Sequence, residues 1–269
     1  MYEKHIVDCF KREKIEYFSV LKYSDCTLIN PRLIERAGFV PRSVIVFLVP
    51  YYSGETVNIS RYAAAGDYHS YIAKLTDAVI TELVGYYPDA KFLGFGDHSP
   101  IDEINAALIA GLGILGDNRL LINEKYGSYV FIGEIITDAP PQLLGAAAPV
   151  PVIRCEGCGL CRTACTGGIL NDPCGVCLSS VTQKKGELSQ SETELIRSGG
   201  SVWGCDACQT CCPHNTDPII TPIKYFSEDR IEYLNSETVD NMTDSEFKLR
   251  AFSWRGKKTV KRNLDILGI

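Results

Sequence analysis

Ten of the twelve cysteines of this chain lie between Cys155 and Cys212, and their spacing limits what the chain can fold into. The stretch opens with Cys155-x2-Cys158-x2-Cys161-x3-Cys165 and closes with Cys205-x2-Cys208-x3-Cys212-Pro213. A spacing of two residues lets one turn of backbone offer three thiolates to three corners of an iron–sulfur cube, and the fourth corner needs a distant cysteine. The pattern therefore predicts that this stretch binds 4Fe-4S clusters.

Two-cluster bacterial ferredoxins repeat such a run twice, and the fourth cysteine of each run reaches the other cluster. By this rule one cluster is bound by Cys155, Cys158, Cys161 and Cys212, and the second by Cys165, Cys205, Cys208 and one more cysteine. The second run lacks its leading cysteine, so Cys174 or Cys177 is expected to fill that place. Cys211 is adjacent to Cys212, and the two cannot easily bind the same cluster. Pro213 follows Cys212 as in ferredoxins, so we choose Cys212 and leave Cys211 unassigned.

Two other uses of these cysteines compete with the clusters. Cys174-x2-Cys177 and Cys205-x2-Cys208 have the spacing of an all-cysteine zinc ribbon, but a ribbon leaves the first four-cysteine run unexplained. A disulfide framework is typical of small secreted domains. The spacing favours two 4Fe-4S clusters over both.

The chain is long enough to bury a full core. It has 269 residues, of which 45% are hydrophobic, and this length allows one or two domains. Residues 1–17 are charged throughout, so no signal peptide is expected. The longest apolar stretches, 106–116 and 143–153, are shorter than the roughly 20 residues that span a bilayer. Cluster thiolates without an export signal or membrane span predict a cytoplasmic protein.

The hydrophobic pattern predicts an α+β fold. We expect strands at 16–22, 43–52, 91–96 and 129–137, helices at 1–14, about 67–87 and 99–109, and a helical tail at the end. The expected parts are a body at 1–150, a two-cluster module at 151–217 and the tail at 218–269.

Several polar residues and glycines fall at the ends of these elements. Asp97 follows a strand, where ligands commonly sit in open α/β sheets, although an aspartate ahead of a Ser-Pro helix start also suits an N-cap. Gly113, Gly116 and Asn118 form a turn where backbone can approach a flat ligand. Glu134, on an apolar strand, either faces solvent or is a pocket acid that needs a partner.

Charge is unevenly distributed along the chain. The net charge is −6, yet residues 248–262 contain seven basic residues and no acid. Such a segment can contact the phosphates of a nucleic acid or of a cofactor tail, and it is also typical of a solvated helix face. Trp254-Arg255 within it suits stacking on a base or packing against the cluster module.

Motifs in a fixed order extend from about Ser43 to Leu267. They are Arg61, Gly66-Asp67-Tyr68-His69, Asp97, Ala110-Gly111-Leu112-Gly113, Gly127-Ser128-Tyr129-Val130-Phe131-Ile132-Gly133-Glu134, the cluster cysteines, Gly204-Cys205-Asp206-Ala207-Cys208-Gln209-Thr210, and Ser253-Trp254-Arg255-Gly256-Lys257-Lys258 with Arg262-Asn263. In these residues the chain resembles the epoxyqueuosine reductase family, cobalamin and iron–sulfur enzymes of tRNA queuosine synthesis. It differs at Thr166, where the family usually has proline, and at Ser60, where some members have cysteine near the cobalt.

The resemblance implies a cobalamin-binding α/β domain like the corrinoid domains of reductive dehalogenases, with an inserted ferredoxin-like two-cluster module. It implies a short form without the C-terminal helical repeats of many members. The family's remaining cluster ligand corresponds to Cys177, and its proton donor to Asp97. Asp67 is expected to line the substrate pocket, and Asp67 or His69 to share the proton transfer. The expected corrinoid contacts are Ser60, Arg61, Tyr68, Gly111, Gly113, Gly116, Asn118, Gly127, Ser128 and Gln209.

The activity that the resemblance implies is reduction of epoxyqueuosine to queuosine in tRNA with loss of water. The clusters are expected to deliver single electrons to cobalamin, and the reduced cobalt is expected to attack the epoxide carbon as a nucleophile. A protonated Asp97 is expected to give its proton to the departing oxygen. The expected partners are tRNA and a low-potential donor such as ferredoxin or flavodoxin, with no membrane. Two alternatives remain. One is a related corrinoid enzyme that acts on another substrate or reduces a partner's corrinoid, and the other is an electron-transfer protein without a corrinoid.

Overall fold

The computed structural model describes residues 4–35 and 37–269 and divides into two compact units. The first unit comprises Met1–Pro50 and His69–Cys155, and the second comprises Tyr51–Tyr68 and Glu156–Ile269. The segment Tyr51–Tyr68 therefore packs with the C-terminal half of the chain. The sequence predicted a body, a two-cluster module and a tail, with boundaries at residues 150 and 217. That division stays a prediction.

The first unit is built on one four-stranded sheet. Its strands are β1 (Phe18–Lys22), β2 (Ser43–Pro50), β6 (Val130–Thr137) and β3 (Phe92–Gly96), in the order β1-β2-β6-β3. All four expected strands are present, with ends within two residues of the expected ones. Every pair is antiparallel, which agrees with the expected α+β fold and differs from the parallel sheet of an open α/β domain.

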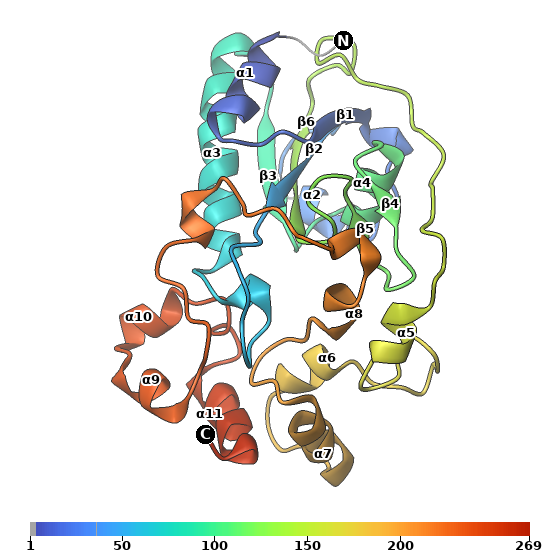
Figure 1. Ribbon diagram of the computed structural model, residues 1–269. Helices are drawn as coiled ribbons and strands as arrows, with labels where there is room; N and C mark the ends of the chain where they lie inside the picture. The colour runs from blue at the N-terminus through green and yellow to red at the C-terminus, as the bar shows by residue number, and fades with distance from the viewer. Residues whose placement is uncertain (1–3, 36) are drawn as a thin grey trace. The chain divides into compact units, whose positions relative to one another are not determined.

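Two helices, α1 (Lys4–Arg12) and α3 (Tyr68–Tyr86), lie side by side along the sheet (Figure 1). Phe10 of α1 packs on Phe47 of β2 with ring centroids 5.3 Å apart. A Cβ atom at Gly94 of β3 would lie 2.5 Å from Cβ of Thr76, so glycine is what lets α3 approach this strand. Residues 1–3, part of the expected first helix, lie outside the described residues.

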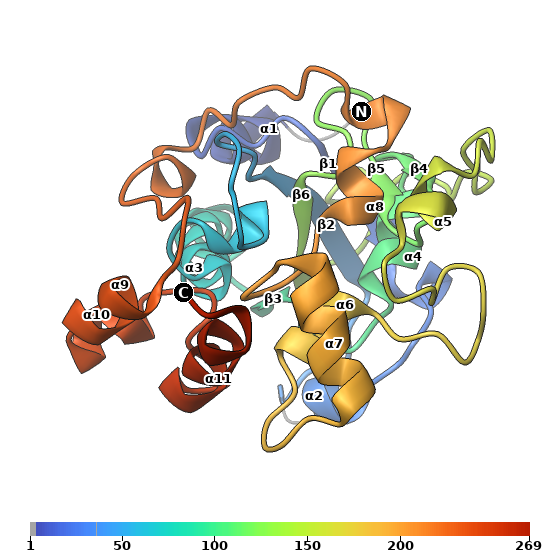
Figure 2. The ribbon, with the colours of Figure 1, turned by 60° about the horizontal axis from the view of Figure 1, so that its bottom comes forward.

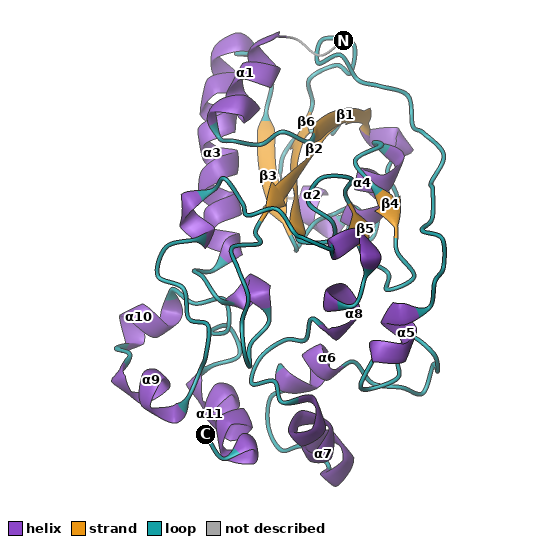
Figure 3. Cartoon of the chain, viewed as in Figure 1, coloured by secondary structure: helices purple, strands orange, loops and turns teal. Residues whose placement is uncertain are grey.

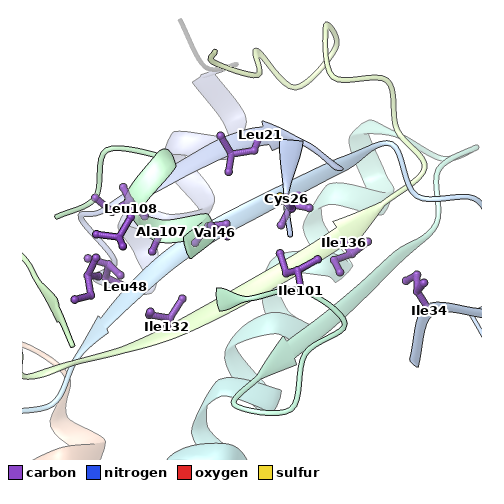
Figure 4. Packing of buried hydrophobic residues seen from close by; sticks show 14 residues of the cluster. Leu21, Cys26, Ile34, Val46, Leu48, Ile101, Ala107, Leu108, Ile132 and Ile136 are labelled. Carbon is purple, nitrogen blue, oxygen red and sulfur yellow. The ribbon is translucent and has the colours of Figure 1, made fainter. Parts of the chain in front are cut away.

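The opposite face of the sheet packs against α4 (Glu103–Ile109). Val46 and Leu48 of β2 and Ile132 of β6 form one cluster with Ala107 and Leu108 of α4 (Figure 4). This cluster also includes Ile101 and Ile136, and its members are at most 9% exposed. The remaining elements of this unit are η1 (Tyr23–Asp25), α2 (Arg32–Glu35), β4 (Ile114–Leu115) and β5 (Leu121–Ile122).

The second unit consists of short helices joined by loops (Figure 3). They are η2 (Arg61–Ala63), α5 (Leu160–Ala164), α6 (Leu178–Thr182), α7 (Gln190–Gly199), α8 (Ala207–Thr210), η3 (Pro213–Asn215), η4 (Lys224–Phe226), α9 (Ser236–Asn241), α10 (Asp244–Lys248) and α11 (Lys257–Leu267). Helices α6 and α7 lie against each other (Figure 2). No helix in the described part of the chain has both the length and the apolarity that a membrane span requires.

The core of the second unit joins segments that are distant in sequence. Trp203 is fully buried and packs with Ile59, Phe252 and Val260. Asn263 of α11 is also fully buried, and its Nδ2 donates hydrogen bonds to the carbonyl oxygens of Thr182 at 2.7 Å and Val202 at 2.8 Å. The predicted helical tail therefore packs directly on the cysteine-rich stretch.

Candidate functional site

Asp97 occupies a strained turn directly after β3. The amide of His98 donates a hydrogen bond to the carbonyl oxygen of Gly96 at 2.9 Å, and Asp97 between them has φ 67°. A γ-turn with positive φ at its central residue is rare, and such backbone strain is found mainly at functional sites. Asp97 therefore lies at the strand end, as the sequence predicted, in a conformation that suggests function.

The side chain of Asp97 reaches His69 in the first turn of α3. His69 Nε2 lies 3.1 Å from Asp97 Oδ2, and the two side chains are 43% and 59% exposed. The structure therefore brings two of the three predicted catalytic residues together.

The alternative role of Asp97 as a helix N-cap is wrong. Helix α4 begins at Glu103, four residues later than expected, and its N-cap is Asp102. The Asp102 carboxylate accepts a hydrogen bond from the Asn105 amide at 3.0 Å. Asp97 is therefore available for another role.

Behind this turn lies Glu134, a fully buried carboxyl group in the middle of β6. Its cross-strand partners are Val46 and Phe95, and Val46 belongs to the apolar cluster under α4. Its Oε2 accepts a hydrogen bond from the Ser99 hydroxyl, and its Oε1 has no hydrogen-bond partner among the described residues. Burial raises the pKa of Glu134 to about 8, and Glu103 and Asp102 add to this increase. Glu134 is thus a buried acid and does not face solvent.

A second acid, Glu103, lies in the first turn of α4 and was not singled out from the sequence. Its Oε2 is buried without a hydrogen-bond partner among the described residues. Burial raises the pKa of Glu103 to about 7, and the neighbouring charge of Asp97 raises it further. Three carboxyl groups therefore interact around the end of β3.

The buried acid predicts how stability depends on pH. The pKa of Glu134 is raised from 4.5 to about 8 on folding, so its contribution to stability is complete below pH 4.5 and is lost as the pH rises through about 8. Between about pH 5.5 and pH 8.5 the unfolding free energy of the parent is expected to decrease more than that of Glu134→Gln. The difference between the two decreases is expected to be roughly 3 kcal/mol. Urea denaturation of the anaerobic protein measures this difference. The exposed Glu35→Gln is the control, and an unchanged decline in Glu134→Gln would contradict the assignment.

The expected flat-ligand contacts of the first unit lie along the β4–β5 hairpin and the turn that follows it. Asn123, 2% exposed, organises this segment: its Nδ2 donates to the carbonyl oxygen of Leu112 at 2.9 Å, and its backbone pairs with Gly127. A Cβ atom at Gly113 would lie 2.5 Å from the carbonyl oxygen of Ile122, so the hairpin itself requires this glycine. The other predicted contacts in the segment are Gly111, Gly116, Asn118 and Ser128.

In the second unit, Ser60 and Arg61 are both bonded to Asp206, the residue after Cys205. The Ser60 hydroxyl donates to Asp206 Oδ1, and the Arg61 amide donates to Asp206 Oδ2 at 2.7 Å. The buried Arg61 guanidinium also donates to Thr210 Oγ1 at 2.9 Å. These contacts anchor the segment Tyr51–Tyr68 to the second cysteine run. Gln209, 7% exposed, joins the same group through an Nε2 hydrogen bond to Asp206 Oδ1 at 3.2 Å.

Asp67 and Tyr68 are held by residues of the C-terminal tail and by the segment Tyr51–Tyr68. The amide of Asp67 donates to the carbonyl oxygen of Leu249 at 2.8 Å, and its own carbonyl accepts from the Tyr225 hydroxyl at 2.9 Å. The ring of Tyr68 packs edge-on against Tyr62 with centroids 6.2 Å apart. The tail therefore positions the backbone of a predicted catalytic residue.

The four cysteines expected around the second cluster interact with one another. Cys205 and Cys208 both interact electrostatically with Cys165 and Cys177, and burial raises the pKa of Cys208 to about 12. A bridge between Gly168 and Val176 closes the intervening loop and draws its two ends together. Cys174 lies within this loop and is exposed. The upstream cysteines whose charge raises the pKa values of Cys205 and Cys208 are Cys165 and Cys177.

The cysteines of the first run differ from one another in exposure to solvent. Cys155 Sγ accepts a hydrogen bond from the Asp117 amide at 3.3 Å, a contact that is common at cluster sulfurs. Cys161 is buried, Cys158 is exposed, and Cys211 interacts electrostatically with Cys212 and Cys158. Within residues 4–35 and 37–269, no three His, Cys, Asp or Glu side chains are arranged to hold a single metal ion.

Much of the predicted basic segment is used for packing inside the second unit. Arg262 donates to the carbonyl oxygens of Lys184 and Gly186, both at 2.7 Å. Lys261 is ion-paired with Asp240. Lys248, Lys258 and Trp254 are exposed, and the Arg255 guanidinium lies 3.6 Å from the centroid of the Trp254 ring. The surface available to an anion is therefore smaller than the sequence suggested.

The main residues that the sequence did not reveal are Glu103, Asn123 and Asp206. Glu103 reads as an ordinary first-turn acid, and its closeness to Asp97 depends on where α4 begins. Asp206 was part of a motif without an assigned contact, and Asn123 was not singled out. No local pattern signals these roles, because each depends on the backbone that the side chain meets.

Comparison with known proteins identifies the relatives of this chain. The epoxyqueuosine reductase of Listeria monocytogenes is 32% identical over 211 residues, a match that covers 75% of this chain and 54% of the relative. The chain spans about half the length of the curated relatives that it matches. No protein-family model matches the chain.

Solved structures share the fold. The epoxyqueuosine reductase of Streptococcus thermophilus superimposes with a TM-score of 0.78 at 23% identity, over 97% of this chain and 79% of that protein. An epoxyqueuosine reductase solved with an epoxyqueuosine-modified tRNA-Tyr stem loop gives 0.77 at 22% identity, over 98% and 80%. Reductive dehalogenases score at most 0.44, so the expected likeness to their corrinoid domains stays a prediction. In sequence and in fold, the chain is similar to epoxyqueuosine reductases.

Proposed function

We propose that this protein reduces epoxyqueuosine to queuosine in tRNA with loss of water. Similarity to epoxyqueuosine reductases supports the proposal, and the observation that carries it is the strained turn that presents Asp97 beside His69. Reduction of an epoxide to an alkene consumes two electrons and two protons and releases one water. The site must therefore supply protons to an oxygen that leaves.

The residues of this chain supply the acid–base part of the reaction. Asp97 donates the proton to the departing epoxide oxygen, and its exposed side chain leaves it within reach of a substrate. His69, 3.1 Å away, exchanges a proton with Asp97 and orients its carboxyl group. Asp67, two residues before His69 in the chain, contacts the substrate.

The thiols of the cysteines between Cys155 and Cys212 suit 4Fe-4S clusters. We assign one cluster to Cys165, Cys177, Cys205 and Cys208, whose thiols interact with one another, and the other to Cys155, Cys158, Cys161 and Cys212. The thiols of Cys205 and Cys208, whose pKa values are raised by burial, would bind as thiolates because the metal displaces their protons. When bound, the clusters supply single electrons and cobalamin supplies a nucleophilic cobalt.

We assign the cobalamin contacts to the buried hydrogen-bonding groups of Ser60, Arg61, Asn118, Ser128 and Gln209, to Tyr68 and to the backbone at Gly111, Gly113, Gly116 and Gly127.

We propose tRNA and an external low-potential donor, such as ferredoxin or flavodoxin, as partners. A relative of the same fold has been solved with an epoxyqueuosine-modified tRNA stem loop. In this chain the exposed Lys248, Lys258 and the stacked pair Trp254–Arg255 offer charge to phosphate and a ring to a base.

Protein purified without air tests the proposal. We expect about eight iron atoms per chain after reconstitution, from two four-iron clusters, and a base-off cob(II)alamin EPR signal on mixing with cobalamin. Conversion of epoxyqueuosine in a tRNA stem loop is the decisive assay. A corrinoid signal without conversion supports a related corrinoid enzyme with another substrate. Full iron content without a corrinoid signal leaves an electron-transfer protein.

A further inference from the structure

The loop that carries Asp97 leaves β3 and returns at once to the sheet. Phe95 of β3 lies opposite Glu134 of β6, and the hydroxyl of Ser99, four residues after Phe95, donates a hydrogen bond to Glu134 Oε2. Directly opposite residues of antiparallel strands have Cα atoms about 5 Å apart, whereas four extended residues span about 13 Å. Residues 96–98 must therefore turn sharply, and the γ-turn at Asp97 is that turn.

The end of this loop is fixed by its backbone and by one side chain. The carbonyl oxygen of Pro100 accepts hydrogen bonds from the amides of Ile29 at 2.9 Å and Asn30 at 3.1 Å. The Ser99 oxygen accepts the amide of Ile101 at 3.2 Å, and Ser99 is 4% exposed. The backbone bonds join the loop to a neighbouring segment, and the Ser99 side chain joins it to β6 of the sheet.

Glu134 accepts the bond from Ser99 at a position where the strand is otherwise apolar. Residues two apart on a strand face the same side, and Ile132 and Ile136 both belong to the cluster under α4 (Figure 4). Glu134 between them is fully buried, and its Oε1 has no hydrogen-bond partner among the described residues. A buried polar atom without a partner costs about 1–3 kcal/mol, a cost that an apolar side chain here would avoid.

The acid nevertheless keeps its acceptor for Ser99. Burial raises the pKa of Glu134 to about 8, so the carboxyl group is mostly protonated at neutral pH and still accepts the bond through its carbonyl oxygen. The γ-turn that this bond closes has positive φ at Asp97, which costs about 1–3 kcal/mol and persists only where the surroundings hold it.

We infer that the hydrogen bond between Ser99 and Glu134 is a latch that holds the γ-turn of Asp97, and that Glu134 is thereby a positioning residue for this proton donor. The inference rests on the proposed role of Asp97 in proton transfer. Glu134 acts through Ser99 and the turn, without contacting the substrate.

Substitutions at both ends of the latch test this role. Ser99→Ala removes the donor, and Glu134→Leu removes the acceptor but keeps a side chain of comparable size. Glu134→Gln keeps an acceptor oxygen and resembles the uncharged acid. Ser43→Ala is the matched control, because Ser43 is fully buried and its hydroxyl donates to the carbonyl oxygen of Ala139 at 2.7 Å. This second serine lies level with the first residue of β3, at the end of the strand remote from Asp97.

Amide hydrogen exchange of the reconstituted holoenzyme gives a readout that needs no substrate. The His98 amide closes the γ-turn through its bond to Gly96, so its exchange, measured on overlapping peptides of residues 92–102, reports on the turn. This exchange is expected to become about 5- to 10-fold faster in Ser99→Ala and in Glu134→Leu. It is expected to stay near the parent rate in Glu134→Gln and Ser43→Ala. Unchanged exchange in Ser99→Ala overturns the inference whatever the activity.

Turnover of the epoxyqueuosine stem loop shows whether the latch serves the reaction. In Ser99→Ala and in Glu134→Leu, kcat is expected to fall roughly 10- to 100-fold with KM unchanged, because the proton donor is displaced while substrate binding is kept. Glu134→Gln is expected to keep kcat within about threefold of the parent. The double variant Ser99→Ala/Glu134→Leu is expected to lose no more than either single variant, because both substitutions remove the same contact.

The remaining outcomes decide against the latch or against the function. Faster exchange with unchanged kcat overturns the positioning role. Losses that add in the double variant, or a loss in Glu134→Leu alone, mean that the two residues act separately and also overturn it. A parent that does not convert the stem loop refutes the proposed function, and the exchange rates then still decide whether the latch holds the turn.

Discussion

Asp97→Asn is expected to lower kcat for the epoxyqueuosine stem loop by roughly 10²- to 10⁴-fold, the usual contribution of a general acid. Asparagine has the same shape and also tolerates positive φ, so the γ-turn at residue 97 should persist. The side-chain amide of asparagine cannot act as an acid towards the departing oxygen. It also replaces the carboxyl group that faces His69 Nε2 with an amide group. Single-turnover conversion of the stem loop measures the loss, and iron and cobalamin content should match the parent.

The matched control is Asp229→Asn, because Asp229 is exposed and also has positive φ, 49°. It should turn over like the parent. If Asp97→Asn does so as well, the acid is another residue, and Asp67 and His69 become the candidates. If Asp97→Asn loses cobalamin or iron, its effect is structural.

Cys177→Ala is expected to remove one whole cluster and with it all turnover. Iron should fall from about eight to about four atoms per chain, because a 4Fe-4S cluster with three protein ligands is poorly retained. The reason to expect this at Cys177 is its electrostatic contact with Cys205 and Cys208. Iron analysis after anaerobic reconstitution, with EPR of the dithionite-reduced protein, measures the result.

Cys174→Ala is the control for this experiment. Cys174 is exposed in the loop closed by Gly168 and Val176, so its loss should leave both clusters intact. The reverse result, with iron lost in Cys174→Ala and kept in Cys177→Ala, would make Cys174 the ligand. About four iron atoms in the parent would mean that one site is incomplete or filled with zinc.

The strands could be predicted because their patterns are local. Residues 44–49 are a continuous apolar run, and every position of β2 proves to be buried. Residues 130–137 carry one charged residue, Glu134, which the sequence left as either a solvent-facing residue or a buried acid. Glu134 is buried because Ser99 bonds its carboxylate and α4 covers this face of the sheet, and neither is adjacent to Glu134 in sequence.

The start of α4 shows why the site was harder to predict. Asp97 and Asp102 both precede the helix, and either can cap a helix in principle. Only the fold shows that Asp102 is the cap, and this leaves Asp97 in the γ-turn after β3. A shift of one turn in the helix start would exchange these roles.

By itself, the sequence predicted the cluster chemistry and the resemblance to epoxyqueuosine reductases, because cysteine spacing and ordered motifs are properties of neighbouring residues. Only the tertiary structure decided that the sheet is antiparallel, that Glu134 is a buried acid and that Asp102, not Asp97, caps α4. The physical reason is that burial and charge interaction depend on groups brought together from distant parts of the chain.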